Sequence, residues 1–310
     1  MNMIAFLFVT IQAGTPLLFA TLGEILTERV GNLNLGVEGM MLMGSVMGFI
    51  VGYNTGNPML ALLAAAISGA LGALIYAFLT VTLKTNQVVT GLTLTIFGGG
   101  FASFIGKNMV GKKLPDGINM FFERIQLPLL KDIPVIGEIF FKQDVFIYLG
   151  YITVILLWIL LFKTNMGLNL RMVGENPGAA DASGINILKY KYGFILLGGA
   201  LCGLGGAYLS LVYVPVWQEN ITSGAGWIAV ALVIFSLWNP LRAIGGAYFF
   251  GGLSIIGFRL QKFDLPISTY LLDMLPYLAT ILVLIFMSVK KSKENKAPKE
   301  LGNPYFREER

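Results

Sequence analysis

The sequence predicts an all-α polytopic membrane protein with about nine transmembrane helices. Hydrophobic residues make up 55% of the 310 positions and charged residues only 13%, which is about half of the charged fraction of a soluble domain. Several apolar runs reach about 20 residues, the length at which a helix crosses a hydrocarbon core roughly 30 Å thick. The 38 glycines are typical of helices that pack closely in lipid. The chain therefore has no room for a large soluble domain.

The apolar runs define nine spans, with boundaries good to a few residues. In chain order they cover roughly residues 3–22, 34–53, 58–83, 87–106, 145–163, 192–214, 225–238, 241–258 and 269–289. The seventh and eighth spans are short and are separated only by Trp-Asn-Pro-Leu-Arg. They could instead form a re-entrant hairpin, which would not change the direction of the other spans. We therefore predict a transmembrane domain over residues 1–289 and a basic tail over residues 290–310.

The basic residues predict the orientation. Seven of the 22 lysines and arginines lie in the tail, which the positive-inside rule places in the cytoplasm. With nine crossings, the N-terminus is then outside. The cytoplasmic segments are residues 24–34, 84–87, 163–191 and 239–242, together with the tail. They hold fourteen basic residues against eight outside, where the main loop covers residues 107–144. Without the tail, the predicted cytoplasmic segments hold seven basic residues and the external segments hold eight, so this orientation depends on the tail.

The order of the spans suggests inverted four-helix repeats. Four spans, a single fifth span and four more give two blocks of opposite orientation. A polar, glycine-bearing segment follows the first span of each block, at residues 32–39 and at residues 220–226. Inverted repeats with interrupted helices are typical of transporters, and the interrupted segments lie near the substrate path. The two segments match only weakly, so a chance arrangement is an equal alternative.

The residues argue against catalysis by this chain. There is no histidine, the commonest general base and metal ligand. The single cysteine, Cys202, lies in a Gly-rich apolar span and reads as a packing residue. No Gly-x-x-x-x-Gly-Lys-Ser/Thr phosphate loop occurs, so any ATP hydrolysis would belong to another polypeptide. We predict that the chain is not an enzyme, with no catalytic residue, no metal site and no cofactor. Nucleic-acid binding is also excluded, because no basic domain with interleaved aromatic residues accompanies the tail.

A polar, turn-rich segment between the fifth and sixth spans is the strongest candidate for an interaction site. Asn176 can cap a helix that begins at Pro177, a favoured first residue, and ends near Gly184. A helix this short is only marginally stable alone, so packing must hold it. We predict that it docks a cytoplasmic subunit, within a docking segment over residues 164–191. A solvated connector that rests on its own protein is the alternative. The predicted docking residues are Gly174, Glu175, Asn176, Pro177, Ala179, Ala180, Asp181 and Gly184.

Three stretches resemble the permeases of ABC-type importers. Arg171-Met-Val-Gly-Glu-Asn-Pro-Gly-Ala-Ala-Asp-Ala-Ser-Gly-Ile185 resembles the coupling segment of the ribose, nucleoside and branched-chain amino acid group, although Arg171 replaces a small residue. Glu28-Arg-Val-Gly-Asn-Leu-Asn-Leu-Gly-Val-Glu-Gly-Met-Met41 resembles the signature of the nucleoside permease subgroup. The stretch from Thr222 to Pro240 is also similar to that subgroup. The likeness covers nearly the whole chain, which implies that residues 1–289 form a permease domain with a type II ABC importer-like fold.

The resemblance implies a multi-component machine in a bacterial cytoplasmic membrane. This chain would be the multi-pass permease subunit that moves nucleosides. Its partners would be a cytoplasmic ABC ATPase that binds ATP and Mg²⁺, a second permease in a heterodimer, an extracellular substrate-binding lipoprotein of the BMP family, and membrane lipid. The alternatives are a permease for ribose, galactose or another simple sugar, and an ion-coupled secondary carrier that acts alone.

A few polar residues at membrane depth are candidates for the substrate path. The predicted path residues are Asn32, Asn34, Glu38, Thr90, Thr93 and Asn220. Ionisable groups inside spans face a cavity or a partner, so Glu38 is the leading one, and Asp273 is a second acidic residue near a span end. A structural network that fixes a helix break is the alternative for Glu38. Back-bonding to helix carbonyls is the alternative for the threonines. On the outer side, residues 107–144 and 213–220 could contact a binding protein.

Overall fold

The computed structural model describes residues 3–125, 136–261, 271–272, 274–289 and 297–307. Helices dominate this part of the chain, and β-structure there is limited to two isolated bridges. The all-α prediction is confirmed. The elements are α1 (Met3–Arg29), α2 (Val37–Thr55), α3 (Pro58–Ala77) continued by the π-helix η1 (Phe78–Thr82), α4 (Gln87–Gly106), the 3₁₀ turn η2 (Lys107–Met109), α5 (Asp116–Phe121), α6 (Ile136–Phe140), α7 (Val145–Lys163), α8 (Asn165–Glu175), α9 (Pro177–Ala182), α10 (Ile187–Tyr208) continued by the π-helix η3 (Leu209–Tyr213), α11 (Ala225–Phe235), α12 (Pro240–Leu260) and α14 (Leu275–Val289).

Asparagine caps fix the starts of several helices close to the predicted span limits. Asn57, Asn86 and Asn239 each accept a hydrogen bond from a backbone N–H two or three residues later, at about 3 Å. Proline occupies the first position of both α3 and α12, where its missing N–H has no intrahelical partner to lose. The local sequence therefore sets where these helices begin.

Within the described part of the chain, six helices are long and apolar enough to cross a membrane by length and composition. They are α1, α3 with η1, α4 with η2, α7, α10 with η3, and α12. α2 has 19 residues but carries Glu38, and α11 has 11 residues, which span only about 16 Å. α11 therefore cannot cross alone. The last predicted span and Asp273 lie partly outside the described residues, so the count of nine crossings stays a prediction.

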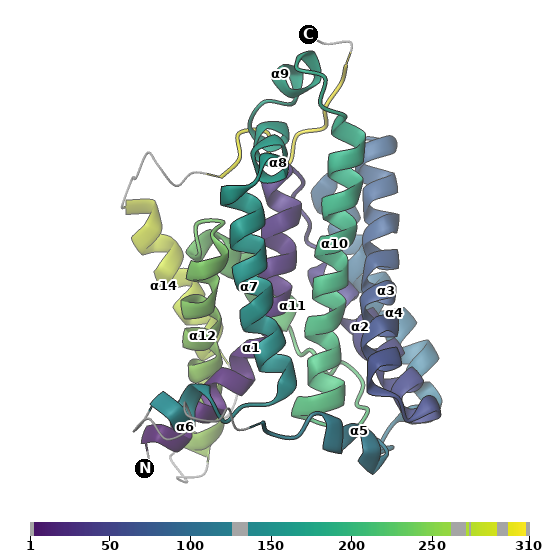
Figure 1. The fold of residues 1–310 in the computed structure, drawn as a ribbon, viewed down its shortest axis with the longest axis vertical. Coiled ribbons are helices and arrows are strands. Elements are labelled where there is room, and N and C mark those ends of the chain that lie inside the picture. Colours follow the sequence, from purple (N-terminus) through teal and green to yellow (C-terminus); the bar gives the residue numbers. More distant parts are fainter. Residues whose placement is uncertain (1–2, 126–135, 262–270, 273, 290–296, 308–310) are drawn as a thin grey trace.

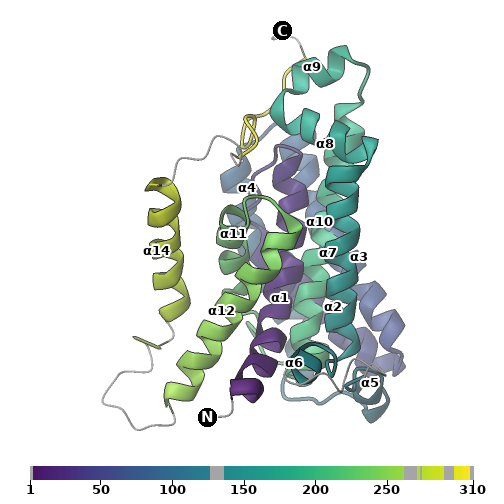
Figure 2. The same ribbon diagram turned by 60° about the vertical axis from the view of Figure 1, so that its left-hand side comes forward.

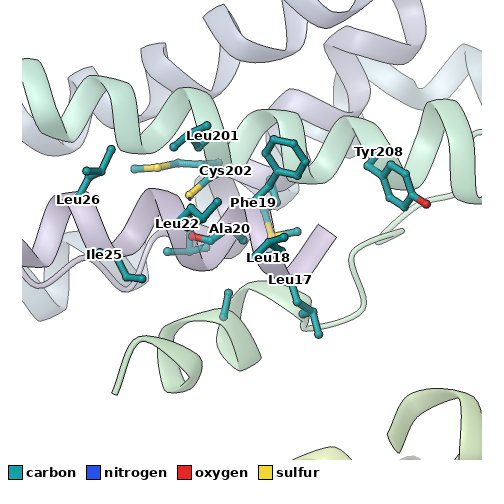
Figure 3. Close-up of a cluster of buried hydrophobic side chains, with 14 of the residues drawn as sticks. Leu17, Leu18, Phe19, Ala20, Leu22, Ile25, Leu26, Leu201, Cys202 and Tyr208 are labelled. Carbon is teal, nitrogen blue, oxygen red and sulfur yellow. Dashed lines mark hydrogen bonds between the residues drawn. The ribbon is translucent and has the colours of Figure 1, made fainter. Parts of the chain in front are cut away.

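The core of the bundle is the contact between α1 and α10. Figure 3 shows Phe19, Ala20 and Leu22 of α1 beside Leu201 and Cys202 of α10. The Cys202 thiol is fully buried and lies 3.7 Å from the carbonyl oxygen of Ala20. Its role as a packing residue agrees with the sequence prediction.

Glycine lets α10 approach its neighbours along the rest of its length. A Cβ added at Gly203 would lie 2.4 Å from the carbonyl oxygen of Ala65 in α3, and a Cβ added at Gly206 would lie 1.9 Å from that of Met41 in α2. No larger residue fits such spacings without moving a helix. The Gly-rich run in the sixth span therefore serves helix packing, as the composition predicts.

The segments predicted to face the cytoplasm lie together at one end of the molecule. Arg29, the last residue of α1, donates to the carbonyl oxygen of Trp238 in the α11–α12 turn at 3.1 and 3.2 Å. In the tail, Glu300 donates its N–H to the carbonyl oxygen of Gly174 at 3.1 Å. α8, α9 and the end of the chain lie at the top of Figure 1, and the N-terminus lies at the bottom. Which end faces the cytoplasm stays a prediction.

Candidate functional site

Between α1 and α2 the backbone leaves the helical path over residues 30–36, and side chains from other helices bind its polar groups. Lipid offers no hydrogen bonds, so irregular backbone at membrane depth requires such partners. The Leu33 N–H donates to Gln87 Oε1 of α4 at 2.7 Å. The Leu33 carbonyl accepts from the Tyr76 hydroxyl of α3 at 2.6 Å. The two helices thus bind both backbone polar groups of one residue in the break.

The next residues of the break are satisfied in the same way. The Asn34 N–H donates to Glu24 Oε1 at 3.0 Å, and Asn34 Oδ1 accepts from the Gly36 N–H at 2.9 Å. The Leu35 carbonyl accepts from Thr95 Oγ1 at 2.9 Å. Thr95 is the ninth of the 20 residues of α4 and Gln87 is the first, so the break extends from the start of this membrane-spanning helix to about its middle.

Glu38 joins this break to the second interrupted segment, just before α11. Its Oε1 accepts from the Thr222 hydroxyl at 2.5 Å and from the Gly224 N–H at 2.8 Å. Its Oε2 accepts from the Gly226 N–H at 2.6 Å. Glu38 is in the first turn of α2, and its donors include the first turn of α11. Two helix N-termini, both of which favour negative charge, therefore meet at one carboxylate.

Glycine permits this meeting. Gly224 has φ +85°, and a Cβ added at Gly226 would lie 2.5 Å from the Glu38 backbone nitrogen. The left-handed backbone at Gly224 turns the chain into α11, and the missing side chain at Gly226 lets the two backbones touch. The polar, glycine-bearing segments predicted from residues 32–39 and 220–226 are thus in direct contact.

The predicted path residues divide into three groups. Asn32, Asn34 and Glu38 are buried and lie in or beside the break. Thr90 and Thr93 bond back to the carbonyl oxygens four residues earlier, at 2.7 and 2.9 Å. Asn220 is exposed with φ +53°. The structure therefore does not gather all six around one opening.

Two acidic residues that belong to this network were assigned to a cytoplasmic loop by the sequence. α1 continues to Arg29, seven residues past the predicted span end, and both Glu24 and Glu28 are buried. Glu28 Oε2 accepts from Trp238 Nε1 at 2.6 Å. The signal that could have found them is their helical spacing of four residues, which places both on one face of the extended helix.

The docking segment forms a short helix at the end of the bundle. Asn176 caps α9 through its Oδ1, which accepts from the Ala179 N–H at 2.9 Å, and Pro177 is the first helical residue. Gly174 and Ala180 are buried, whereas Asn176, Ala179 and Gly184 are exposed. The predicted docking residues therefore include both the internal support of α9 and an outward face that a partner can reach.

The opposite end carries a cavity of about 600 Å³ between α5, η3 and the start of α7. Asp144 caps α7 through the Ile147 N–H at 3.0 Å and accepts from the Tyr208 hydroxyl at 3.1 Å. Burial raises the pKa of the Asp144 carboxyl above its ordinary value, an effect these two hydrogen bonds oppose. Arg124 and Glu123 also line the cavity. Its mixed polarity is compatible with a surface that receives a partner or a solute.

The comparison with known families decides what this arrangement is. Residues 6–284 match the family model of the permease component of branched-chain amino acid transport systems. The chain belongs to this permease family. No solved structure matches the permease significantly.

Close relatives of the permease cover it almost completely. The guanosine ABC transporter permease protein NupQ of Bacillus subtilis is 38% identical over 97% of this chain and 96% of its own. The putative glucose ABC transporter permease protein TsgC13 of Haloferax volcanii is 37% identical over 96% of each chain. The nucleoside ABC transporter permease protein NupC of Lactococcus lactis is 35% identical over 94% of each. A more distant relative, the guanosine permease NupP, is a second chain of Bacillus subtilis, 25% identical over 79% of this one.

These relatives are ABC transporter permeases, and so is this chain. It is a multi-pass membrane protein that moves a solute and is not an enzyme. Permeases of this family work with the other components of an ABC transporter. Among the described residues, no group of three or more acidic or cysteine side chains could hold a metal ion.

Proposed function

We propose that this permease is the membrane subunit of an ATP-driven importer that carries nucleosides inward across a bacterial cytoplasmic membrane. α9 docks a separate ATPase that binds ATP and Mg²⁺. A second, related permease completes the pathway, and an extracellular binding lipoprotein delivers the cargo at the end that carries α5. In this proposal the N-terminus is outside and the tail is cytoplasmic.

The bridge between Glu38 and the start of α11 is the observation that carries this proposal. It connects the two interrupted segments of the bundle at membrane depth. The same network reaches the end that carries α9 through Arg29 and Trp238. A pull on α9 can therefore reach the break through packed helices. Because Asn32, Asn34 and Glu38 are buried, we assign them to the shape of the gate rather than to direct contact with cargo.

The cargo assignment rests on relatives. Of the three near-full-length relatives described above, two are named for guanosine or nucleosides and the third for glucose. A simple sugar is therefore the second candidate. The presence of two guanosine permease chains in Bacillus subtilis supports a heterodimer rather than two copies of this chain.

Reconstitution tests the proposal. The permease, its ATPase, the second permease and the binding protein are placed in proteoliposomes, and uptake of labelled guanosine and labelled glucose is measured with ATP. We expect guanosine uptake that stops when the ATPase carries a Lys-to-Ala change in its phosphate loop. Uptake of glucose alone would support the second candidate. Uptake by this chain without an ATPase, driven by a proton or sodium gradient, would contradict both.

A further inference from the structure

The tail folds back over the docking segment. Residues 297–307 lie along α8 and α9 at the end of the bundle, coloured yellow in Figures 1 and 2. We call this segment the strap. At its far end the Tyr305 hydroxyl donates to Asp181 Oδ2 of α9 at 3.1 Å, and Arg307 Nε reaches the same oxygen at 3.1 Å. One carboxylate oxygen of α9 therefore receives two donors from the strap.

The middle of the strap is attached to the start of the break. The Glu300 N–H donates to the Gly174 carbonyl at 3.1 Å, and the Gly302 N–H approaches the Gly31 carbonyl at 3.4 Å. Gly31 and Gly174 also touch, since a Cβ added at Gly31 would lie 3.4 Å from the Cα of Gly174. The strap thus contacts α9, the end of α8 and the first residues after α1 within one short segment.

A third contact of the strap reaches the turn that precedes α4. The Lys84 ammonium lies 4.1 Å from the centre of the Phe306 ring, a distance at which a cation is attracted to the ring face. Lys84 lies in the turn between η1 and α4. α4 in turn supplies Gln87 to the break. The strap therefore bridges the docking helix and two of the elements that surround the break.

Positive charge alone does not account for these contacts, because the Arg307 side chain is the one charged group that the strap contributes to them. Lys299 is exposed. The groups that attach the strap are the Tyr305 hydroxyl, the Arg307 guanidinium, the Phe306 ring and two backbone N–H groups. Attraction of lysines to a membrane surface would not by itself produce these contacts. The specific hydrogen bonds point to a mechanical role for the strap.

We propose that the strap is a coupling element, which ties α9 to the α1–α2 break so that movement of the docked ATPase is delivered to the gate. This inference rests on the proposed function. Tyr305 and Arg307 act as positioning residues, because they touch α9 and no cargo. A single exposed ion pair contributes little, so the two donors to Asp181 are removed together in the test.

The test compares Tyr305→Phe/Arg307→Ala with Lys299→Ala in the complete reconstituted complex. Lys299→Ala removes a positive charge from the same strap without removing a contact to α9. Guanosine transported per ATP hydrolysed is measured, together with co-purification of the ATPase. Amide hydrogen exchange over residues 177–184 is measured on the permease alone. We expect the double variant to keep its ATPase, to lose transport per ATP by about 2- to 30-fold, the range for residues that carry coupling, and to exchange faster in α9. The control should match the wild type.

Three results would overturn the inference. The first is unchanged transport per ATP in the double variant. The second is loss of the ATPase at normal permease levels, which would assign the strap to assembly. The third is unchanged exchange in α9. Failure of the proposed function has a different signature: the wild type itself would move no guanosine with ATP, while the exchange measurement would still report whether the strap restrains α9.

Discussion

The Glu38 carboxylate accepts the backbone N–H of Gly226 at 2.6 Å, across 188 residues of sequence. This contact joins the first turns of α2 and α11, the two helices that begin after interrupted segments. A buried anion here is satisfied by three donors and two helix dipoles rather than by a cation. One carboxylate therefore lies at the ends of both breaks, and changes at this position are the most direct test of the gate.

Glu38→Gln should impair transport more than folding. An amide keeps one oxygen acceptor but turns an N–H₂ toward backbone donors, so one buried N–H is left unpaired at a cost of about 1–3 kcal/mol. We expect a lower melting temperature and at least a severalfold loss of guanosine uptake. Glu219→Gln, an exposed position in the same loop region, is the matched control and should behave as the wild type. Normal uptake by both Glu38→Gln and Asn34→Ala would remove the break from the gating mechanism.

Gly226→Ala tests whether the two backbones need their close approach. The added Cβ would lie 2.5 Å from the Glu38 nitrogen and 2.7 Å from its Oε2, so α11 must move or the hydrogen bonds must lengthen. Overpacking of this kind costs about 1–3 kcal/mol. Thermal unfolding in detergent and uptake are the measurements.

The control for this change is Gly193→Ala in α10, where nothing lies within 4 Å of the added Cβ. Alanine in a helix interior is favoured over glycine by about 0.5–1 kcal/mol, so this variant should be neutral or slightly more stable. Equal melting temperatures and equal uptake for Gly226→Ala and Gly193→Ala would mean that α2 and α11 are not closely packed at Gly226.

The starts of several helices can be predicted from the sequence because their capping signals are local. Asn57-Pro58 and Asn239-Pro240 each place a cap before a proline, and the structure begins α3 and α12 at those prolines. Asn176-Pro177 gave α9 in the same way. Such signals need no knowledge of the rest of the fold.

The network around the break could be predicted only in part, because its partners are distant in sequence. Hydropathy placed Glu28 outside the membrane, since nothing nearby reveals that the indole of Trp238, 210 residues later, will donate to it. The tail was expected to act through its charge for the same reason. Its contact from Tyr305 to Asp181 crosses 124 residues, and no local pattern indicates such a pair.

Asn176→Ala separates the docking helix from general stability. Loss of an asparagine cap costs about 0.5–2 kcal/mol, and α9 has only six residues to absorb that loss. We expect weaker binding of the ATPase, measured by co-purification and by titration of purified ATPase onto the permease. Asn57→Ala removes an equivalent cap from α3 near the opposite end. It should lower stability by a similar amount and leave ATPase binding unchanged. Equal ATPase binding by the two variants would contradict a docking role for α9.

The orientation can be read with single cysteines, because the only native one, Cys202, is 1% exposed. In a Cys202→Ala background, Gly117→Cys reports α5, where an added side chain meets nothing within 4 Å, and Ser183→Cys reports the exposed end of α9. Figure 1 places α5 and α9 at opposite ends. A membrane-impermeant maleimide should label Gly117→Cys in intact cells and Ser183→Cys only after permeabilisation. The reverse pattern would place α9 outside, where no ATPase could reach it. That result would contradict both the docking role of α9 and the coupling role of the strap.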